Sequence, residues 1–207
     1  WTHPDEGFEA AVHGGVDVAY DDIDINDGLQ RLLAQIEQPG WSNALGQKLV
    51  QLTAPGVPDV YQGTELWDDS LVDPDNRRPV DFGVRRELLG LAEAPRVDAS
   101  GAAKLWVVRH ALRLRRERPE LFTGYLPRYA TGPAAHHLLA FDRGGAITLV
   151  TRLPYTLSTG HDGWGDTAID LDGAWRDELT GSLHQGPARL GTVFEQLPVA
   201  LLVRCPE

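Results

Sequence analysis

The sequence predicts a chain in two parts, an α/β part at residues 1–122 and an all-β part at residues 123–207. Three observations carry this prediction. Apolar residues recur at helical spacing over most of the first 120 residues. A short apolar stretch, Val57–Tyr61, then opens into a long polar loop. From Tyr125 onward, apolar and polar residues alternate between glycine and proline turns, which is typical of short antiparallel strands.

The helices of the first part are predicted from their apolar faces and from the residues that begin and end them. Each has acids or a capping residue at its start, or a proline or glycine after its end. The predicted helices are one beginning at 2–6, one from Asn26 or Asp27 to Pro39-Gly40, one from Ser42 to Pro55-Gly56, one at 85–91 and one at 102–117.

The stretch Val57–Tyr61 predicts a buried strand, because it is rich in β-forming residues and too short for a helix. A helix that leads into a short buried strand is a unit of a parallel sheet or barrel. In such folds, ligands bind at the carboxyl ends of the strands. The polar loop leaves from that end, and this position is the first indication of where a functional site lies.

The second part predicts an antiparallel sheet. His137, Leu139 and Phe141 alternate with polar or small neighbours, Gly144-Gly145 predicts a hairpin turn, and AITLVT follows as the partner strand. Further strands are expected at TAIDL, AWRDEL and PVALLVR. The side chains expected in the core of this sheet are Trp175, Leu179, Val199, Leu201 and Val203.

Composition excludes several classes of partner. The net charge is −11 and the isoelectric point about 5.0, so we expect neither a nucleic acid nor an anionic membrane surface as a partner. No apolar run approaches the roughly 20 residues that span a bilayer. The single cysteine, Cys205, cannot form an internal disulfide, which favours a cytoplasmic location. The chain opens on Trp1 and contains no methionine, so we expect a piece of a longer protein.

No metal or cofactor site is expected. The seven histidines show no ligand spacing, and the adjacent His136 and His137 would point to opposite faces of a strand. Asp162, Asp166 and Asp170 lack the dense oxygen spacing of a calcium loop. The sequence also contains no phosphate-binding glycine motif.

The polar loop combines the residue types that bind sugars. Aromatic rings pack against the C–H faces of a sugar, and planar carboxylate, amide and guanidinium groups bind its paired hydroxyls. The candidate binding residues are Tyr61, Gln62, Glu65, Trp67, Asp73, Asn76 and Arg77. The alternative is a network of Asp–Arg ion pairs that holds the loop and binds no ligand.

The loop also resembles a known family. TAPGVPDVYQGTELWDDSLVDPDNRRPVDF is similar to the segment of maltooligosyl trehalose synthases around the eighth strand of their barrel. These enzymes belong to the α-amylase superfamily, glycoside hydrolase family 13. Within that segment, DPDNR resembles the D-P-x-N-R element that holds a donor-side glucose. The opening WTHPDEGFEAAV and the ending WRDELTG…LPVALLV extend the resemblance over nearly the whole chain.

The resemblance implies the end of a (β/α)8 TIM barrel, followed by an antiparallel C-terminal β-sandwich domain. It implies that maltooligosaccharide is the substrate, and that its reducing-end α-1,4 linkage becomes an α,α-1,1 linkage. The family retains configuration through a covalent glycosyl intermediate, with two carboxyl groups roughly 5 Å apart. Those carboxyl groups lie on earlier strands, so no catalytic residue is assigned here. The missing amino-terminal part of the same enzyme is the expected partner.

Two alternatives remain open at this stage. One is another glycoside hydrolase of the α-amylase family, which would produce new reducing ends instead of removing them. The other is a non-catalytic carbohydrate-binding module, which would fold alone and bind maltodextrin by itself.

Overall fold

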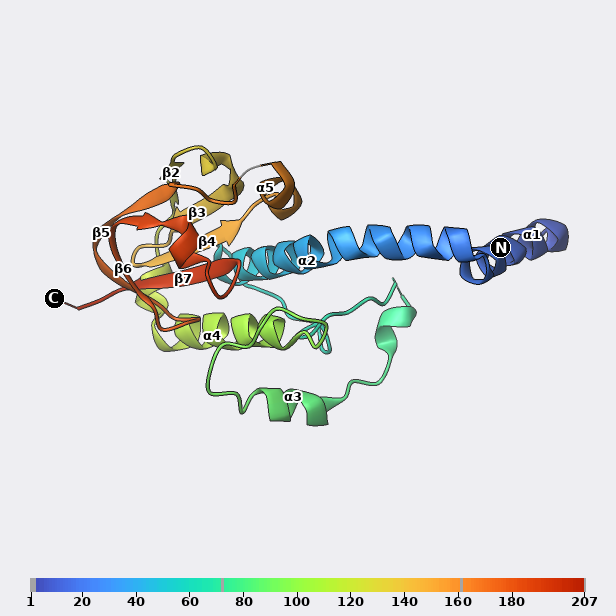
Figure 1. Ribbon diagram of the computed structural model, residues 1–207. Coiled ribbons are helices and arrows are strands. Elements are labelled where there is room, and N and C mark those ends of the chain that lie inside the picture. Colours follow the sequence, from blue (N-terminus) through green and yellow to red (C-terminus); the bar gives the residue numbers. More distant parts are fainter. Residues whose placement is uncertain (1–2, 72, 161, 207) are drawn as a thin grey trace. The chain divides into compact units, whose positions relative to one another are not determined.

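The computed structural model describes residues 3–71, 73–160 and 162–206. Figure 1 shows the course of the chain from its helical beginning to the sheet at its end. The chain divides into two compact units, Trp1–Gln38 and Pro39–Glu207. Each unit is described by itself.

The first unit consists of helix α1 (Glu6–Asp21) and the beginning of helix α2 (Ile23–Thr53). Helix α1 begins after Asp5, whose carboxylate accepts a hydrogen bond from the Phe8 N–H at 3.0 Å. The sequence therefore predicted this helix and the acids at its start. None of the residues of α1 is buried, and the apolar side chains of both helix segments remain exposed within the described unit.

Helix α2 is continuous, and the predicted break at Pro39-Gly40 is wrong. The helix runs from Ile23 to Thr53 with Pro39 inside it. A proline inside a helix costs about 3 kcal/mol relative to alanine. Leu45, Leu49 and Leu52 are fully buried in the same helix, and burying a leucine side chain contributes roughly 1.5–3 kcal/mol. These leucines stabilise the part of α2 that follows Pro39.

The predicted strand at Val57–Tyr61 is also wrong for this chain. These residues follow α2 as irregular backbone, with Val57 97% exposed. A strand exists only through hydrogen bonds to neighbouring strands, and a parallel strand needs neighbours to complete its ladder. The described residues contain no strand beside 57–61, because all of their ladders are antiparallel and lie after residue 125.

Two helices follow the loop. Helix α3 (Phe82–Leu88) begins after Asp81, whose carboxylate accepts from the N–H groups of Gly83 and Val84. Helix α4 (Ala102–Glu117) has the predicted bounds. Among the residues that the structure describes, three short 3₁₀ turns lie between the main elements, and they are η1 (Asp75–Arg77), η2 (Pro119–Phe122) and η3 (Ala135–His137).

The remainder forms one curled antiparallel sheet. Its strands are β1 (Leu126–Arg128), β2 (Ala130–Thr131), β3 (Leu138–Asp142), β4 (Ala146–Thr151), β5 (Ala168–Asp177), β6 (Leu183–Arg189) and β7 (Val199–Arg204). The order is β1-β3-β4-β7-β5-β2, with β6 also paired to β5. Strands β1 and β2 are consecutive along the chain. Of these two, β1 pairs with β3 and β2 pairs with β5. Two short helices, α5 (Pro154–Gly160) and α6 (Leu190–Val193), connect strands.

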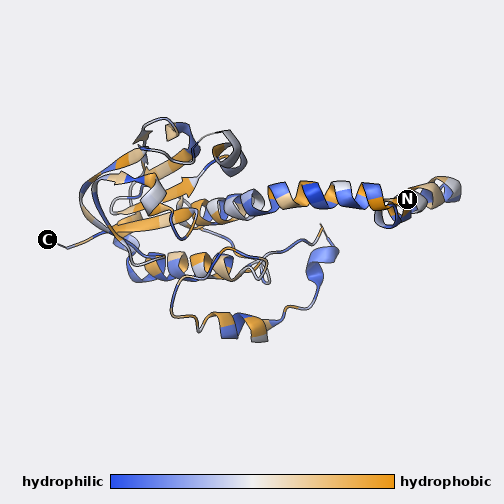
Figure 2. Ribbon diagram, viewed as in Figure 1, coloured by the Kyte–Doolittle hydropathy of each residue, from blue (hydrophilic) through white to orange (hydrophobic). Residues whose placement is uncertain are grey.

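The sheet is apolar on both faces. The predicted hairpin is confirmed, with β3 and β4 paired across Gly144-Gly145. The five predicted core residues are all at most 4% exposed, so this prediction is confirmed as well. Trp175 lies in a cluster formed within the sheet region. The other four belong to a cluster that also contains residues of α2 and α4. Figure 2 shows the apolar residues along the central strands and along α4.

The prediction for the paired histidines is wrong. His136 and His137 lie in η3 instead of a strand, and their rings are 4.0 Å apart. A strand would separate them onto opposite faces, whereas a tight turn brings neighbouring side chains together.

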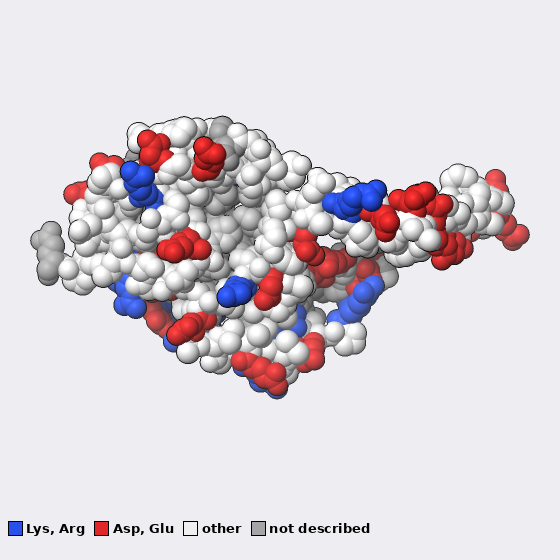
Figure 3. Space-filling view, viewed as in Figure 1, with Lys and Arg blue, Asp and Glu red and all other residues white. Residues whose placement is uncertain are grey.

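Charged side chains of both signs lie on the surface. On the face that Figure 3 shows, Lys and Arg side chains are scattered among Asp and Glu. Among the described residues, no helix combines the length and the apolar character that a membrane span requires.

Candidate functional site

The start of the loop between α2 and α3 is held by side chains that donate hydrogen bonds to main-chain carbonyl oxygens. Arg115 of α4 donates to the carbonyl oxygens of Leu52 and Ala54, at 2.9 and 3.2 Å, at the point where α2 ends. Gln51 donates from its amide to the carbonyl oxygen of Asp59 at 2.8 Å. The loop therefore leaves α2 in a fixed direction although it contains no regular structure at its start.

Glu65 is used by the loop itself. Its carboxylate accepts from Arg85 Nε at 2.9 Å and from the Gly63 N–H at 3.1 Å. The side chains of Glu65 and Arg85 are only 21% and 14% exposed. Gly63 has φ +93°, and a Cβ there would lie 3.0 Å from Val80, so glycine allows the turn to pack closely. Through these contacts, Glu65 holds the conformation of the loop.

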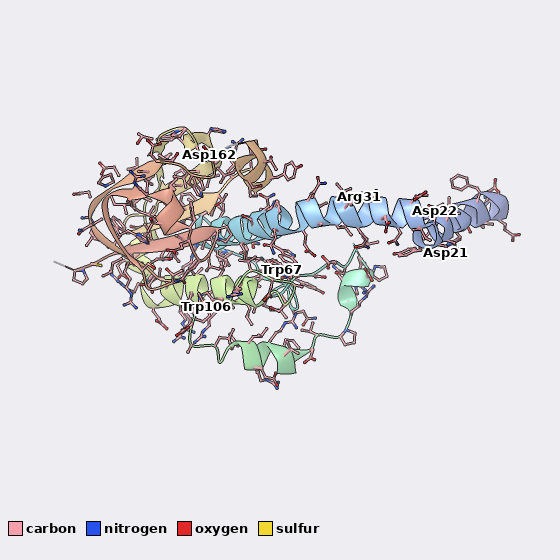
Figure 4. The ribbon with its side chains drawn as sticks, viewed as in Figure 1. Asp21, Asp22, Arg31, Trp67, Trp106 and Asp162 are labelled. Carbon is pink, nitrogen blue, oxygen red and sulfur yellow. The ribbon has the colours of Figure 1, made fainter. Side chains whose placement is uncertain are left out.

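Trp67 is also packed by the chain. Its ring stacks on Trp41 of α2 with centroids 6.0 Å apart, and its indole N–H donates to the Asp98 carbonyl at 2.7 Å. The Lys104 ammonium lies 5.7 Å from the ring centroid. Figure 4 shows Trp67 in this position between α2 and α4. Because Trp41 takes one face of the ring, Tyr61, which is 46% exposed, is the more open of the two predicted aromatic platforms.

The main chain of α4 approaches the loop closely beside Trp67. Gly101, the residue before α4, has φ +70°. A Cβ at that position would lie 2.7 Å from the main-chain nitrogen of Trp67. Lys104 donates to the Leu66 carbonyl at 2.8 Å. Burial and, second, the nearby Lys48 lower the pKa of the Lys104 ammonium. The loop is thus held from one side by a helix end and a half-buried cation.

Asp73 and Arg77 face each other across one turn of the loop. Arg77 Nε lies 2.6 Å from one carboxylate oxygen of Asp73, and its Nη2 lies 3.0 Å from the other. The pair is bidentate and open to solvent, with the two side chains 69% (Arg77) and 58% (Asp73) exposed. A second pair, Arg78 with Asp75, lies beside it. Both groups of the first pair retain accessible edges for a ligand.

A polar cavity of about 280 Å³ lies against this loop. Its lining includes Gln62, Trp67, Asp69, Asp75, Asn76 and Arg78. Three of the predicted site residues, Gln62, Trp67 and Asn76, are thus brought to one cavity. Tyr61, Glu65, Asp73 and Arg77 are not part of its lining.

Three further residues of this region were not among the candidate binding residues predicted from the sequence. Arg85 lies 20 positions after Glu65 and completes its ion pair. Arg78 binds Asp75, and Asp69 lines the cavity. The signal for Arg78 was its place next to Arg77, but no spacing in the sequence connects Glu65 with Arg85.

One further electrostatic feature distinguishes the carboxylates of the loop. Hydrogen bonds from the Ser70 hydroxyl and N–H lower the pKa of Asp68.

In the described part of the chain, no group of three His, Cys, Asp or Glu side chains has the arrangement of a metal site. The chemistry that the region offers is hydrogen bonding to a polar ligand.

Known proteins resemble this chain over 99% of its length. The structure of maltooligosyltrehalose synthase from Arthrobacter ramosus superposes with a TM-score of 0.95 at 52% sequence identity. The chain is similar, along nearly all of its length, to part of maltooligosyl trehalose synthase. A curated protein of Mycobacterium tuberculosis, provisionally named as the same synthase, is 47% identical. A glycosyltrehalose synthase structure, DSM5389, aligns at 25% identity with a TM-score of 0.82.

The match covers only part of these synthases. The chain spans 26% of the length of the curated synthase and 28% of the Arthrobacter chain. No protein-family profile matches the sequence. The similarity therefore identifies the relatives of this chain, and the activity of a whole synthase enters below as a proposal.

Proposed function

We propose that this chain is the carboxyl-terminal portion of a cytoplasmic maltooligosyl trehalose synthase. The observation that supports this most strongly is the similarity to the Arthrobacter synthase at 52% identity along the whole chain. The helices α2 and α4 would close the end of a TIM barrel. The stretch 57–61 would become its last strand once neighbouring strands flank it, and the curled sheet would form the domain after the barrel.

The proposed reaction is a rearrangement of maltooligosaccharide. The reducing-end α-1,4 bond breaks, the oligosaccharide stays on the enzyme as a covalent glycosyl intermediate, and the released glucose attacks through its anomeric hydroxyl. The product has an α,α-1,1 linkage. Water must be kept out until the glucose has turned, or hydrolysis competes. The catalytic carboxylates would belong to the rest of the enzyme, so the 207 residues alone should form no trehalose linkage.

The role proposed for this chain is to hold the donor side of the substrate. Asp73 accepts and Arg77 donates hydrogen bonds to hydroxyls of one glucose unit, and their bidentate pairing keeps both groups in one plane. Tyr61 supplies an exposed ring next to the turn that ends at Glu65. The Glu65–Arg85 pair keeps this turn in place.

The test is substitution of the pair in the complete enzyme. Asp73→Ala and Arg77→Ala are each expected to lower kcat/KM. The loss of transition-state stabilisation should be about 1–3 kcal/mol, which is the effect of losing a hydrogen bond to a charged group. Arg77→Lys should not restore activity, because lysine lacks the planar fork. Hydrolysis should rise relative to rearrangement, and analysis of reducing ends measures this ratio.

The ion-pair alternative gives a different result. An exposed pair contributes only about 0–1 kcal/mol to stability, so a purely structural role predicts a small fall in Tm with normal kinetics. Well-folded Asp73→Ala and Arg77→Ala enzymes with unchanged kcat/KM would rule out the substrate contact. Product analysis of the wild-type enzyme separates rearrangement from the hydrolase alternative, and maltodextrin binding by the chain alone would favour the binding module.

A further inference from the structure

Both lysines of the chain lie where helices α2 and α4 approach each other. Lys48 of α2 and Lys104 of α4 line the same cavity of about 410 Å³. The Lys48 ammonium donates to the side-chain oxygen of Gln51 in its own helix at 2.7 Å. The Lys104 ammonium instead donates to the Leu66 carbonyl oxygen at 2.8 Å. Of the two, Lys104 is therefore the lysine that links a helix to the loop between α2 and α3.

Lys104 contacts the loop where the loop and the end of α4 pack closely. The Trp67 ring, with Trp41 stacked on it, lies 5.7 Å from the Lys104 ammonium. A Cβ on Gly101 would lie 2.7 Å from the main-chain nitrogen of Trp67 and 3.2 Å from the Leu66 Cα. This close approach limits movement of the loop toward α4, and the hydrogen bond from Lys104 opposes movement away from it.

The charge of Lys104 also attracts the loop. Burial, which is the largest effect, and the nearby Lys48 lower the pKa of the Lys104 ammonium, whereas the carboxylates of Asp68, Glu65 and Asp69 act in the opposite direction. An ammonium that opposite charges favour in this way attracts the segment that carries them. Lys104 thus adds an electrostatic attraction to its hydrogen bond with the loop.

The segment that Lys104 holds forms part of the candidate site. Trp67 and Asp69 line the 280 Å³ cavity, and the chain continues from there to the Asp73–Arg77 pair. In the proposed rearrangement, the released glucose must turn while water is kept out. A displacement of about 1 Å in a supporting residue can lower the rate of such a step strongly. A loop that is folded but loosely held would therefore favour hydrolysis over rearrangement.

We propose that Lys104 is a positioning residue for the rearrangement. It holds Leu66 and Trp67 in the place where the loop keeps water from the reacting sugar. It acts through these two residues instead of contacting the substrate. This inference rests on the function proposed above.

Lys104→Met in the complete enzyme tests this role. Methionine is unbranched and keeps an apolar stem beside the Trp67 ring, but it removes the ammonium and its hydrogen bond to Leu66. With maltopentaose as substrate, the kcat for rearrangement should fall about tenfold, while KM changes by less than about twofold. Hydrolysis should not fall, so the ratio of hydrolysis to rearrangement should rise about tenfold. Analysis of reducing ends measures both rates.

The product ratio separates positioning from a merely structural role. A loss of stability lowers both rates in proportion to the folded fraction, so it leaves their ratio unchanged. If Lys104→Met does not fold, Lys104→Gln takes its place, because it also removes the charge, and the ratio should rise in the same direction.

Two further variants serve as controls. Lys48→Met removes the same charge from the same cavity and leaves the bond to Leu66 in place, so its product ratio should stay within about twofold of wild type. Lys104→Arg should restore most of the wild-type ratio, because the guanidinium keeps the charge and can donate to the Leu66 carbonyl.

Three results would overturn the inference. They are a product ratio in Lys104→Met that equals that of wild type, an equal rise in Lys48→Met, and a Lys104→Arg enzyme no better than Lys104→Met. A wild-type enzyme that only hydrolyses would disprove the proposed function, and this inference with it. A wild-type enzyme that rearranges, with Lys104→Met matching it, would disprove this inference alone.

Discussion

Replacement of Trp175 with alanine is expected to lower the free energy of unfolding by about 3–5 kcal/mol. Trp175 is 1% exposed in the core of the curled sheet, and its indole N–H donates to the Asp172 carbonyl at 3.0 Å. The Arg204 guanidinium lies 4.9 Å from the ring centroid. The substitution removes the packing contacts, leaves a cavity and deprives Arg204 of this contact. Urea unfolding of the chain measures the effect.

The control for Trp175 is Tyr129→Ala, because Tyr129 is an aromatic residue between β1 and β2 that is 81% exposed. Its effect on stability should stay within about 0.5 kcal/mol. In the complete enzyme, turnover per folded molecule should persist in the Trp175→Ala variant. A fully folded variant that loses turnover would contradict a purely structural role for this core.

The second large effect concerns Asp177 and pH. Asp177 is completely buried, and burial raises its pKa to about 6, although three hydrogen bonds oppose the shift. The donors are the N–H groups of Leu179 and Leu201, each at 3.0 Å, and the Thr180 hydroxyl at 2.7 Å. Among the described residues, no cation forms an ion pair with this carboxylate.

The direction of the pH effect follows from the raised pKa. Between about pH 4 and pH 6 the folded chain binds a proton at Asp177 that the unfolded chain has released, so stability falls as pH rises through this interval. The fall amounts to about 3 kcal/mol, from two pKa units at about 1.4 kcal/mol each. It is complete just above pH 6, and the contribution of Asp177 to stability is constant beyond that.

Asp177→Asn isolates this contribution. The asparagine carbonyl can accept from Leu179 and Leu201 as before, and the amide stays neutral at every pH. The free energy of unfolding of the variant relative to wild type should therefore increase by about 3 kcal/mol between pH 4 and pH 7. Other carboxylates cancel in this difference. A difference that is constant across the interval would show that Asp177 titrates normally.

The sequence predicted those elements whose limits are set by local chemistry. Helix α4 has the predicted bounds because Gly101 precedes it and Pro119 follows it. The β3–β4 hairpin is likewise determined by Gly144-Gly145. Pro39-Gly40 is the same kind of signal, yet α2 continues through it. Local propensity is a weak guide, because the tertiary context can override it.

The candidate site was predictable only in part. The sequence left open a network of Asp–Arg ion pairs in the loop, and the structure contains such a pair between Asp73 and Arg77. The pairing of Glu65 with Arg85 depends on how the loop folds back on α3, which no periodicity reveals. Residues 57–61 have the composition of a strand, but composition cannot supply the neighbouring strands that a ladder requires. Whether the candidate residues bind sugar stays a prediction.

The contacts of Arg143 affect how residues 39–207 unfold. Its side chain is buried at 4% exposure, and it donates to carbonyl oxygens of Thr53, Phe122 and Gly124, which belong to the end of α2, to η2 and to the chain just before β1. The apolar cluster that contains Leu45 also contains Val203. Residues 39–207 should therefore melt in one cooperative transition. Cutting the gene at codon 122 should yield a sheet fragment that does not fold by itself. The cut would remove the apolar side chains that α2 and α4 pack against the sheet, and it would leave the Arg143 guanidinium without its Thr53 and Phe122 acceptors.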